Sequence, residues 1–120
     1  MSSDPDPRYL QGIEHFNRRE FFEAHDIWEE LWREMRGDHA RDYYQGLIQA
    51  AVALHHYRNG NRSGAGRMWG FALERLERFR PAHEGLDVDG FIAGMWKAVE
   101  GAYEGRPYED SAVPKVALKK

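Results

Sequence analysis

The chain has 120 residues, of which 42% are hydrophobic and 13% aromatic, and its formal net charge at pH 7 is −3. This length supports one hydrophobic core, and the near balance of 17 basic and 20 acidic residues gives no overall field that would attract nucleic acid or an anionic membrane. The absence of cysteine excludes disulfide frameworks, thiolate zinc sites and cysteine nucleophiles, and favours a reducing compartment. We therefore expect one cytoplasmic domain over residues 1–120.

The first helix is expected after a short polar segment. Residues 1–6 are rich in Ser, Asp and Pro, carry no signal-peptide pattern, and are expected to form a flexible leader. Pro7 suits the first turn of a helix, and the hydrophobic residues that follow it recur at helical spacing as far as Phe16. The pattern predicts a helix over residues 7–18, a short turn, and a second helix over residues 21–36.

The next helix is expected to be the central one. Hydrophobic residues cover most of its circumference between residues 40 and 58, which is typical of a helix buried on several sides. Asn59 and Gly60 end it, and the spacing then predicts a fourth helix over residues 62–79. A fifth is predicted over residues 87–104, with Asp87 as N-cap. Its expected buried stripe is Phe91, Ile92, Met95, Trp96, Val99 and Tyr103. Residues 105–120 are expected to form an irregular tail with a basic end.

The predicted fold class is all-α, because no segment shows the alternation typical of a strand. A weak internal repeat appears when the chain is shifted by 41 residues, and each copy would be a helical hairpin similar to those of tetratricopeptide proteins. The matching pairs are Phe16 with Tyr57, Ala24 with Ala65, Ile27 with Met68, and Trp28 with Trp69. We expect a compact bundle of about five helices, in which two such hairpins pack with the C-terminal helix.

Polar side chains interrupt the hydrophobic pattern of the second and third predicted helices. His25 and Glu29 are four residues apart and can touch on one helix face, and antiparallel packing would bring His55 to the same level. One hypothesis is a divalent metal site with candidate ligands Glu23, His25, Glu29 and His55. Another is acid–base catalysis by candidate residues His25, Glu29, Gln45 and His55. A third is that these groups are core residues that hydrogen-bond to their neighbours. Gln49 and His56 rank behind them.

The same residues carry a resemblance to a known family. The segments concerned are Asn17-x4-Phe22-Glu23-Ala24-His25, Trp28-Glu29-x2-Trp32, Tyr44-Gln45-Gly46-Leu47-Ile48-Gln49, Leu54-His55, and Gly60-Asn61 with Ala65. In this order they resemble the family catalogued as domain of unknown function 309, over about residues 9–80. The resemblance implies a small, all-helical prokaryotic protein. It also implies that Glu23, His25, Glu29, Gln45 and His55 occupy the recurring polar positions of that family.

Two functions are compatible with these observations. The first is a helical-hairpin module for protein interaction or self-association, whose partner would be another protein or a second copy of the chain. The alternative is a small metal-dependent or acid–base enzyme, similar to a hydrolase, that uses the His/Glu/Gln cluster. A polar cluster that is sealed and fully paired favours the first, whereas a cluster that lines a pocket with an open ligand position favours the second.

Overall fold

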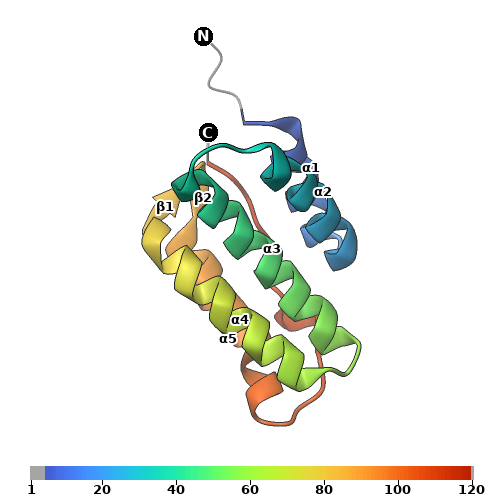
Figure 1. The fold of residues 1–120 in the computed structure, drawn as a ribbon. Helices are drawn as coiled ribbons and strands as arrows, with labels where there is room; N and C mark the ends of the chain where they lie inside the picture. The colour runs from blue at the N-terminus through green and yellow to red at the C-terminus, as the bar shows by residue number, and fades with distance from the viewer. Residues whose placement is uncertain (1–4, 120) are drawn as a thin grey trace.

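The computed structural model describes residues 5–119, which fold into a helical bundle (Figure 1). Its elements are α1 (Pro7–Asn17), α2 (Phe21–Glu34), α3 (Asp38–Arg58), α4 (Arg62–Leu76), the 3₁₀ turn η1 (Glu77–Phe79), β1 (Ala82–His83), β2 (Leu86–Asp87), α5 (Val88–Tyr103) and the 3₁₀ turn η2 (Asp110–Ala112). The all-α prediction is confirmed, and each helix begins and ends within a few residues of its predicted bounds. Most of the predicted leader, residues 1–4, lies outside the described residues, and Asp6 is the N-cap of α1.

One expectation about secondary structure is wrong, because the chain does contain a sheet. β1 and β2 form a small antiparallel hairpin in which Ala82 pairs with Asp87 and His83 with Leu86. Its turn holds Glu84 and Gly85, both at positive φ. Strands of two residues are too short to show an alternating pattern, so hydrophobic periodicity does not predict them. Asp87 also caps α5, as predicted, by accepting a hydrogen bond from the Gly90 N–H.

The two helical hairpins repeat one backbone geometry at the predicted spacing of 41 residues. Arg19 and Gly60 occupy the same place in the two turns, and both have positive φ, 65° and 86°. The Glu20 N–H donates to the His15 carbonyl at 2.8 Å, and the Asn61 N–H donates to the His56 carbonyl at the same distance. The chain therefore makes the same turn between α1 and α2 as between α3 and α4.

The core surrounds α3, which packs against α2 on one side and α4 on the other, with α5 behind (Figure 1). Leu54 of α3 is completely buried, and Trp28 of α2 is 2% exposed. Two residues of the stripe predicted for α5 are not buried: Trp96 and Tyr103 are 40% and 54% exposed. The Tyr103 hydroxyl instead donates to the Gly66 carbonyl at 2.8 Å, so its ring lies over α4 at the surface.

The C-terminal segment is irregular apart from η2, but it packs along the bundle. Val113 is buried, and the side chain of Asn17 pairs with both backbone groups of Val116, at 2.8 and 2.7 Å. The Lys119 N–H donates to the carbonyl of Gly85, in the turn of the β hairpin. The tail thus joins α1 to the β hairpin. Within residues 5–119, no helix is both long enough and apolar enough to cross a membrane.

Candidate functional site

His25 and Glu29 form the predicted pair on α2. The His25 Nε2 atom lies 2.9 Å from a Glu29 carboxylate oxygen, and its Nδ1 atom lies 3.2 Å from the Asp26 carboxylate. Glu29 also forms an ion pair with Arg33, one turn further along the helix. The side chains of His25 and Glu29 are 24% and 30% exposed. They therefore belong to a charged network at the edge of α2 and do not line a closed pocket.

His55 lies at the level of His25, as the antiparallel register predicts, but the Phe22 ring lies between them. The centroid of the Phe22 ring is 5.8 Å from that of His25 and 5.6 Å from that of His55. The amide of Asn59 donates to the His55 Nε2 atom at 3.2 Å. Among the described residues, the buried His55 Nδ1 atom has no hydrogen-bond partner. His55 is thus the least satisfied of the candidate residues.

The environment of His55 favours its neutral form. Burial lowers the pKa of the His55 imidazole below its usual value of 6.5, and the positive charges of Arg58, His56 and His25 lower this pKa further. The carboxylate of Glu23 acts in the opposite direction, but it is the smallest of these influences. At neutral pH the ring therefore offers an uncharged surface beside Phe22.

Gln45 does not join this group. It precedes His55 by ten residues on the same helix, which separates their backbones by about 15 Å along the axis. Its neighbours on that side of α3 face α4: Arg75 donates to Gln49 at 3.4 Å and lies 3.5 Å from the Asp42 carboxylate. The structure therefore brings His25, Glu29 and His55 close together and leaves Gln45 apart.

The structure does not assemble the predicted metal ligands. Within residues 5–119, no three side chains among His, Cys, Asp and Glu are grouped so that they could hold a metal ion. Both ring nitrogens of His25 already face carboxylates, and Phe22 separates His25 from His55. The proposed set of Glu23, His25, Glu29 and His55 therefore does not form one coordination site in this structure.

The polar candidates of α3 nevertheless share one surface. Between residues 41 and 57 of α3, the side chains that are not fully buried lie along one side of the helix, between α2 and α4. They are Arg41, Asp42, Gln45, Val52, His55 and His56. Ile48, which is 7% exposed, lies within the same row. We call this row, with Ile48, the exposed strip of α3.

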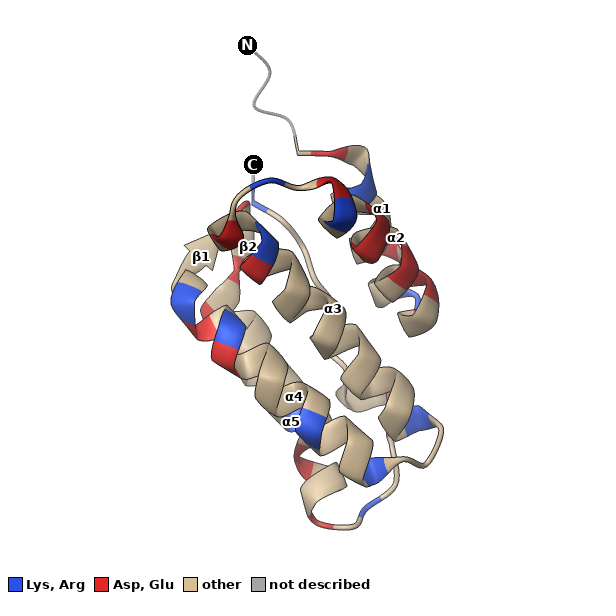
Figure 2. Ribbon diagram, in the orientation of Figure 1, with Lys and Arg blue, Asp and Glu red and all other residues tan. Residues whose placement is uncertain are grey.

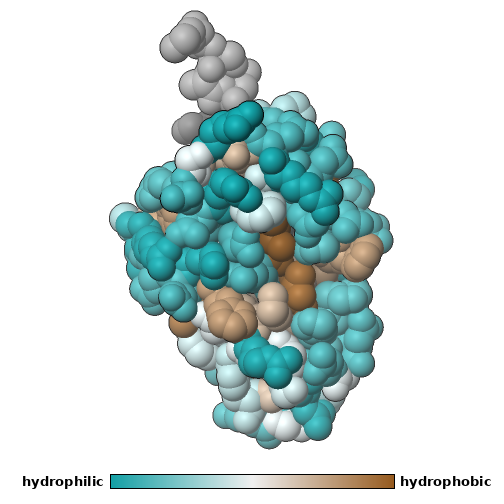
Figure 3. Space-filling view, viewed as in Figure 1, coloured by the Kyte–Doolittle hydropathy of each residue, from teal (hydrophilic) through white to brown (hydrophobic). Residues whose placement is uncertain are grey.

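Hydrophobic side chains border the exposed strip of α3 on both sides. Phe22 of α2 is 51% exposed and contacts His55, and Phe71 of α4 is 48% exposed. Phe71 precedes Arg75 by one turn and so lies on the side of α4 that faces Gln49 and Asp42. Figure 3 shows hydrophobic surface in the middle of this side of the molecule, over α3. We call the surface formed by the exposed strip, Phe22 with its neighbours on α2, and Phe71 with its neighbours on α4 the α2–α3–α4 face.

The two helices that border the α2–α3–α4 face differ in their overall charge (Figure 2). Helix α2 has five acidic residues and one arginine, whereas α4 has three arginines and one glutamate. They are Glu23, Asp26, Glu29, Glu30, Glu34 and Arg33 on α2, and Arg62, Arg67, Arg75 and Glu74 on α4. Glu30 and Glu34 pair with Arg8 of α1, so they lie on the side of α2 that faces α1.

A cavity of about 900 Å³ lies on another side of the bundle, next to Tyr44 and Glu84. The Tyr44 hydroxyl donates to the Glu84 carboxylate at 3.3 Å, and the Tyr9 hydroxyl donates to the Glu84 carbonyl at 3.1 Å. Burial is the main cause that raises the pKa of both tyrosines, so they stay protonated donors. This cluster was not predicted from the sequence, because Glu84 belongs to the β hairpin, which has no sequence pattern of its own.

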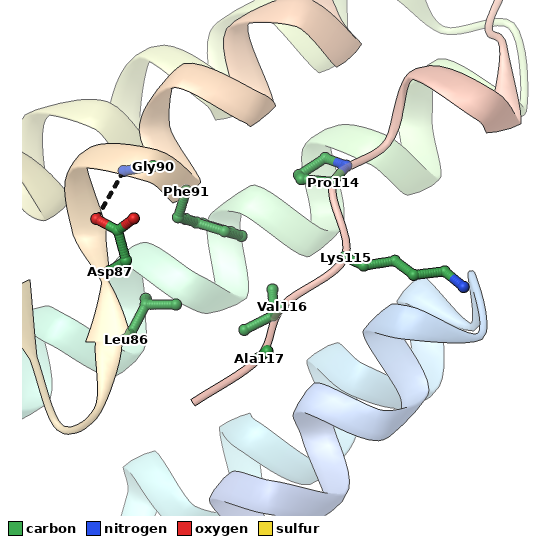
Figure 4. Close-up of a pocket in the computed structure, with 8 residues that line it drawn as sticks. All are labelled: Leu86, Asp87, Gly90, Phe91, Pro114, Lys115, Val116 and Ala117. Carbon is green, nitrogen blue, oxygen red and sulfur yellow. Dashed lines mark hydrogen bonds between the residues drawn. The ribbon is translucent and has the colours of Figure 1, made fainter. Parts of the chain in front are cut away.

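A smaller cavity of about 290 Å³ lies between the start of α5 and the C-terminal segment (Figure 4). Its carboxylate, Asp87, already accepts a hydrogen bond from the Gly90 N–H at 3.0 Å as the helix cap. Phe91 and Pro114 form its apolar part. The Asp87 carboxylate therefore has a structural role.

Comparisons with known proteins agree with the resemblance found in the sequence. Residues 9–68 match the family described as "Domain of unknown function (DUF309)". A protein of Bacillus subtilis (strain 168), described as uncharacterized protein YpuF, is 38% identical over 77 residues, which are 64% of this chain and 44% of that protein. An uncharacterized protein of Aquifex aeolicus (strain VF5) is 43% identical over 95 residues, which are 78% of this chain and 28% of that protein.

The chain thus spans less than half the length of these two relatives. The matched segment extends from α1 into α4 and contains His25, Glu29, Gln45 and His55, together with Phe22 and the whole of α3. Since this segment is half of the chain, the protein belongs to the DUF309 family of helical domains of unknown function.

Proposed function

We propose that the protein is a protein-interaction module that binds through the α2–α3–α4 face. The observation that carries this proposal is the pair of phenylalanines, Phe22 and Phe71, that lie about half exposed on opposite borders of the exposed strip of α3. Full burial of a phenylalanine side chain contributes roughly 1.5–3 kcal/mol, so covering both rings is a substantial source of binding energy. Exposed hydrophobic surface bordered by charged groups is typical of interaction sites.

The polar residues of the face fit the same role. The His25 ring contacts both Asp26 and Glu29 at the edge of α2, so these two carboxylates lie beside the hydrophobic centre. The acid–base alternative has narrower support, namely the 2.9 Å contact between His25 and Glu29. Gln45, the third group of that hypothesis, is too far along α3 to act on a substrate held by this pair.

Photo-crosslinking from chosen positions tests the proposal. A benzophenone amino acid would replace Phe22, Phe71 or, as a control, Leu10 of α1, which is 42% exposed but outside the face. On irradiation of cells that make each variant, we expect discrete protein adducts from the two face positions and not from the control. Folded variants that give no adduct from either face position, or equal adducts from all three, would contradict the proposal.

A further inference from the structure

We propose that the partner of the α2–α3–α4 face is a second copy of the chain, bound face to face about a two-fold axis parallel to α3. This inference rests on the proposed function, because it names the partner of the same face. It is carried by the distribution of hydrophobic and charged groups across the face, which is complementary to itself in this one orientation.

The hydrophobic part of the face can pair with a copy of itself. Phe22 and Phe71 stand on opposite borders, and Ile48 and Val52 lie between them on α3. A two-fold axis parallel to α3 places the α2 border of one copy over the α4 border of the other, so each copy covers Phe22 of its partner with α4 and Phe71 of its partner with α2. All four rings then become covered in one closed assembly, and no exposed hydrophobic surface of this face is left over.

The charges select the axis. A two-fold axis parallel to α3 places the acidic α2 of one copy over the basic α4 of its partner, twice in each dimer. An axis across α3 would instead place α2 over α2 and α4 over α4, with like charges together. Juxtaposed like charges oppose association, so the parallel arrangement is the favoured one.

The register of the helices makes this pairing specific. Phe22 contacts His55, and α2 runs antiparallel to α3. Asp26, one turn after Phe22, therefore lies at about the level of Ala51 on α3. Arg75 lies level with the segment between Asp42 and Gln49, so Arg67, two turns earlier on α4, reaches nearly the same level as Asp26. A parallel two-fold axis preserves level along α3. Asp26 of one copy therefore faces Arg67 of the other on both borders of the interface.

The size of the face fits a reversible dimer. The 14 residues of α2 and the 15 of α4 lie beside α3 over roughly 22 Å, at 1.5 Å per residue. The bundle is 25 Å across in its two short directions. A face of this length and width has an area of roughly 550 Å² per copy. The dimer would then bury about 1,100 Å² in total, which lies at the small end of specific interfaces. An interface of this size fits a dimer that dissociates on dilution.

Sedimentation velocity across a concentration series, from about 1 to about 200 μM, measures this equilibrium directly. We expect monomer at the lowest concentration and dimer at the highest. Phe71→Ser should weaken dimerisation by about tenfold or more, whereas the matched control Leu10→Ser, outside the face, should leave it unchanged. Circular dichroism of both variants checks that the helices remain folded.

Charge reversal tests the axis. Asp26→Arg and Arg67→Glu change exposed residues, and each alone should weaken the dimer by about tenfold, because each creates like-charge contacts on both borders. An equimolar mixture of the two variants should regain the wild-type association as a heterodimer. Dimers that depend on Phe71 but not on these charges would overturn the axis.

Wild-type protein that stays monomeric at every concentration would overturn the second-copy proposal. The proposed function would survive that result if crosslinks from Phe22 and Phe71 join a different protein. It would fail together with the inference if the face gives no crosslink at all.

Discussion

His55 has the most unusual environment of the polar residues in the exposed strip of α3. Its Nδ1 atom is buried without a partner in the described structure, while its Nε2 atom accepts from Asn59. Leaving a buried polar atom unpaired costs roughly 1–3 kcal/mol, and protonation would add a charge to this partly desolvated ring. The ring therefore contributes to the hydrophobic surface around Phe22 only while it is neutral.

This environment makes the stability of the protein depend on pH. The pKa of His55 is lowered in the folded state, so below 6.5 the unfolded chain binds a proton more readily than the folded chain. The contribution of His55 to stability is therefore complete above that pH and is lost as the pH falls towards the folded-state pKa. We expect His55→Gln to reduce the loss of unfolding free energy between about pH 7 and about pH 5, measured by urea denaturation.

His83 provides the comparison for this experiment. Its pKa is also lowered, mainly by burial, and it lies in the β hairpin, away from the exposed strip. The His55 variant should therefore retain the part of the pH dependence that comes from His83, and substitution of both histidines should remove more of it. A His55 variant whose stability falls with pH as steeply as that of the wild type would show that the ring is not held neutral by folding.

At the scale of single elements, small residues decide how closely the helices approach. Gly12 of α1 lies directly beneath the indole of Trp28 on α2, and a Cβ atom added there would overlap that ring. The indole N–H donates to the Tyr9 carbonyl at 3.2 Å, which fixes the ring over α1. Gly70, in the middle of α4, has no neighbouring atom within 4 Å of an added Cβ.

These two glycines should respond to alanine in opposite ways. Gly12→Ala forces the Trp28 ring to move in a packed core and should lower the unfolding free energy by about 1–3 kcal/mol or more. Gly70→Ala should raise it by about 1 kcal/mol, because alanine favours the helix and meets no obstacle. Urea denaturation followed by circular dichroism measures both. Equal midpoints for the two variants would contradict the packing of α1 against α2.

The helices could be predicted well because both signals depend on residues that are close together in the sequence. These signals are the hydrophobic periodicity and the residues that end or cap a helix, such as Asp87 and Asn59-Gly60. The sequence also predicted the level of His25 with His55, since that follows from antiparallel packing. It did not predict the Phe22 ring between them, because an intervening side chain depends on tertiary packing. The prediction that Gln45 lies beside His55 did not allow for the helical rise of α3. Ten residues of an α-helix span about 15 Å along the axis, whatever packs around them.

Features that join distant parts of the chain were the hardest to predict. Glu84 reaches Tyr44 only through the two-residue strands of the β hairpin, and Tyr103 leaves the core to bond the Gly66 carbonyl. Neither contact has a local sequence pattern. The cavity near Glu84 and the aromatic surface between α4 and α5 therefore became visible only in three dimensions.

On the scale of the whole molecule, the C-terminal segment closes the bundle. The family match ends at residue 68, inside α4, yet α5 and the tail pack against the matched part. Asn17, the last residue of α1, binds both backbone groups of Val116, and Arg19 donates to the Val113 carbonyl at 2.9 Å. Asn17 and Arg19 thus hold an irregular segment that lies 99 and 94 residues further along the chain.

This arrangement predicts that Asn17 stabilises the tail more than α1. Asn17→Ala leaves two partly buried backbone groups of Val116 without their partners and should cost about 1–3 kcal/mol, whereas Gln11→Ala, at an exposed position of the same helix, should have little effect. Hydrogen exchange should accelerate first at residues 113–119, because the lost contacts are the ones that hold this segment against α1. If exchange instead accelerates throughout α1 while the tail stays protected, the tail is held by its hydrophobic side chains, with Val113 at their centre, and the bundle closes without Asn17.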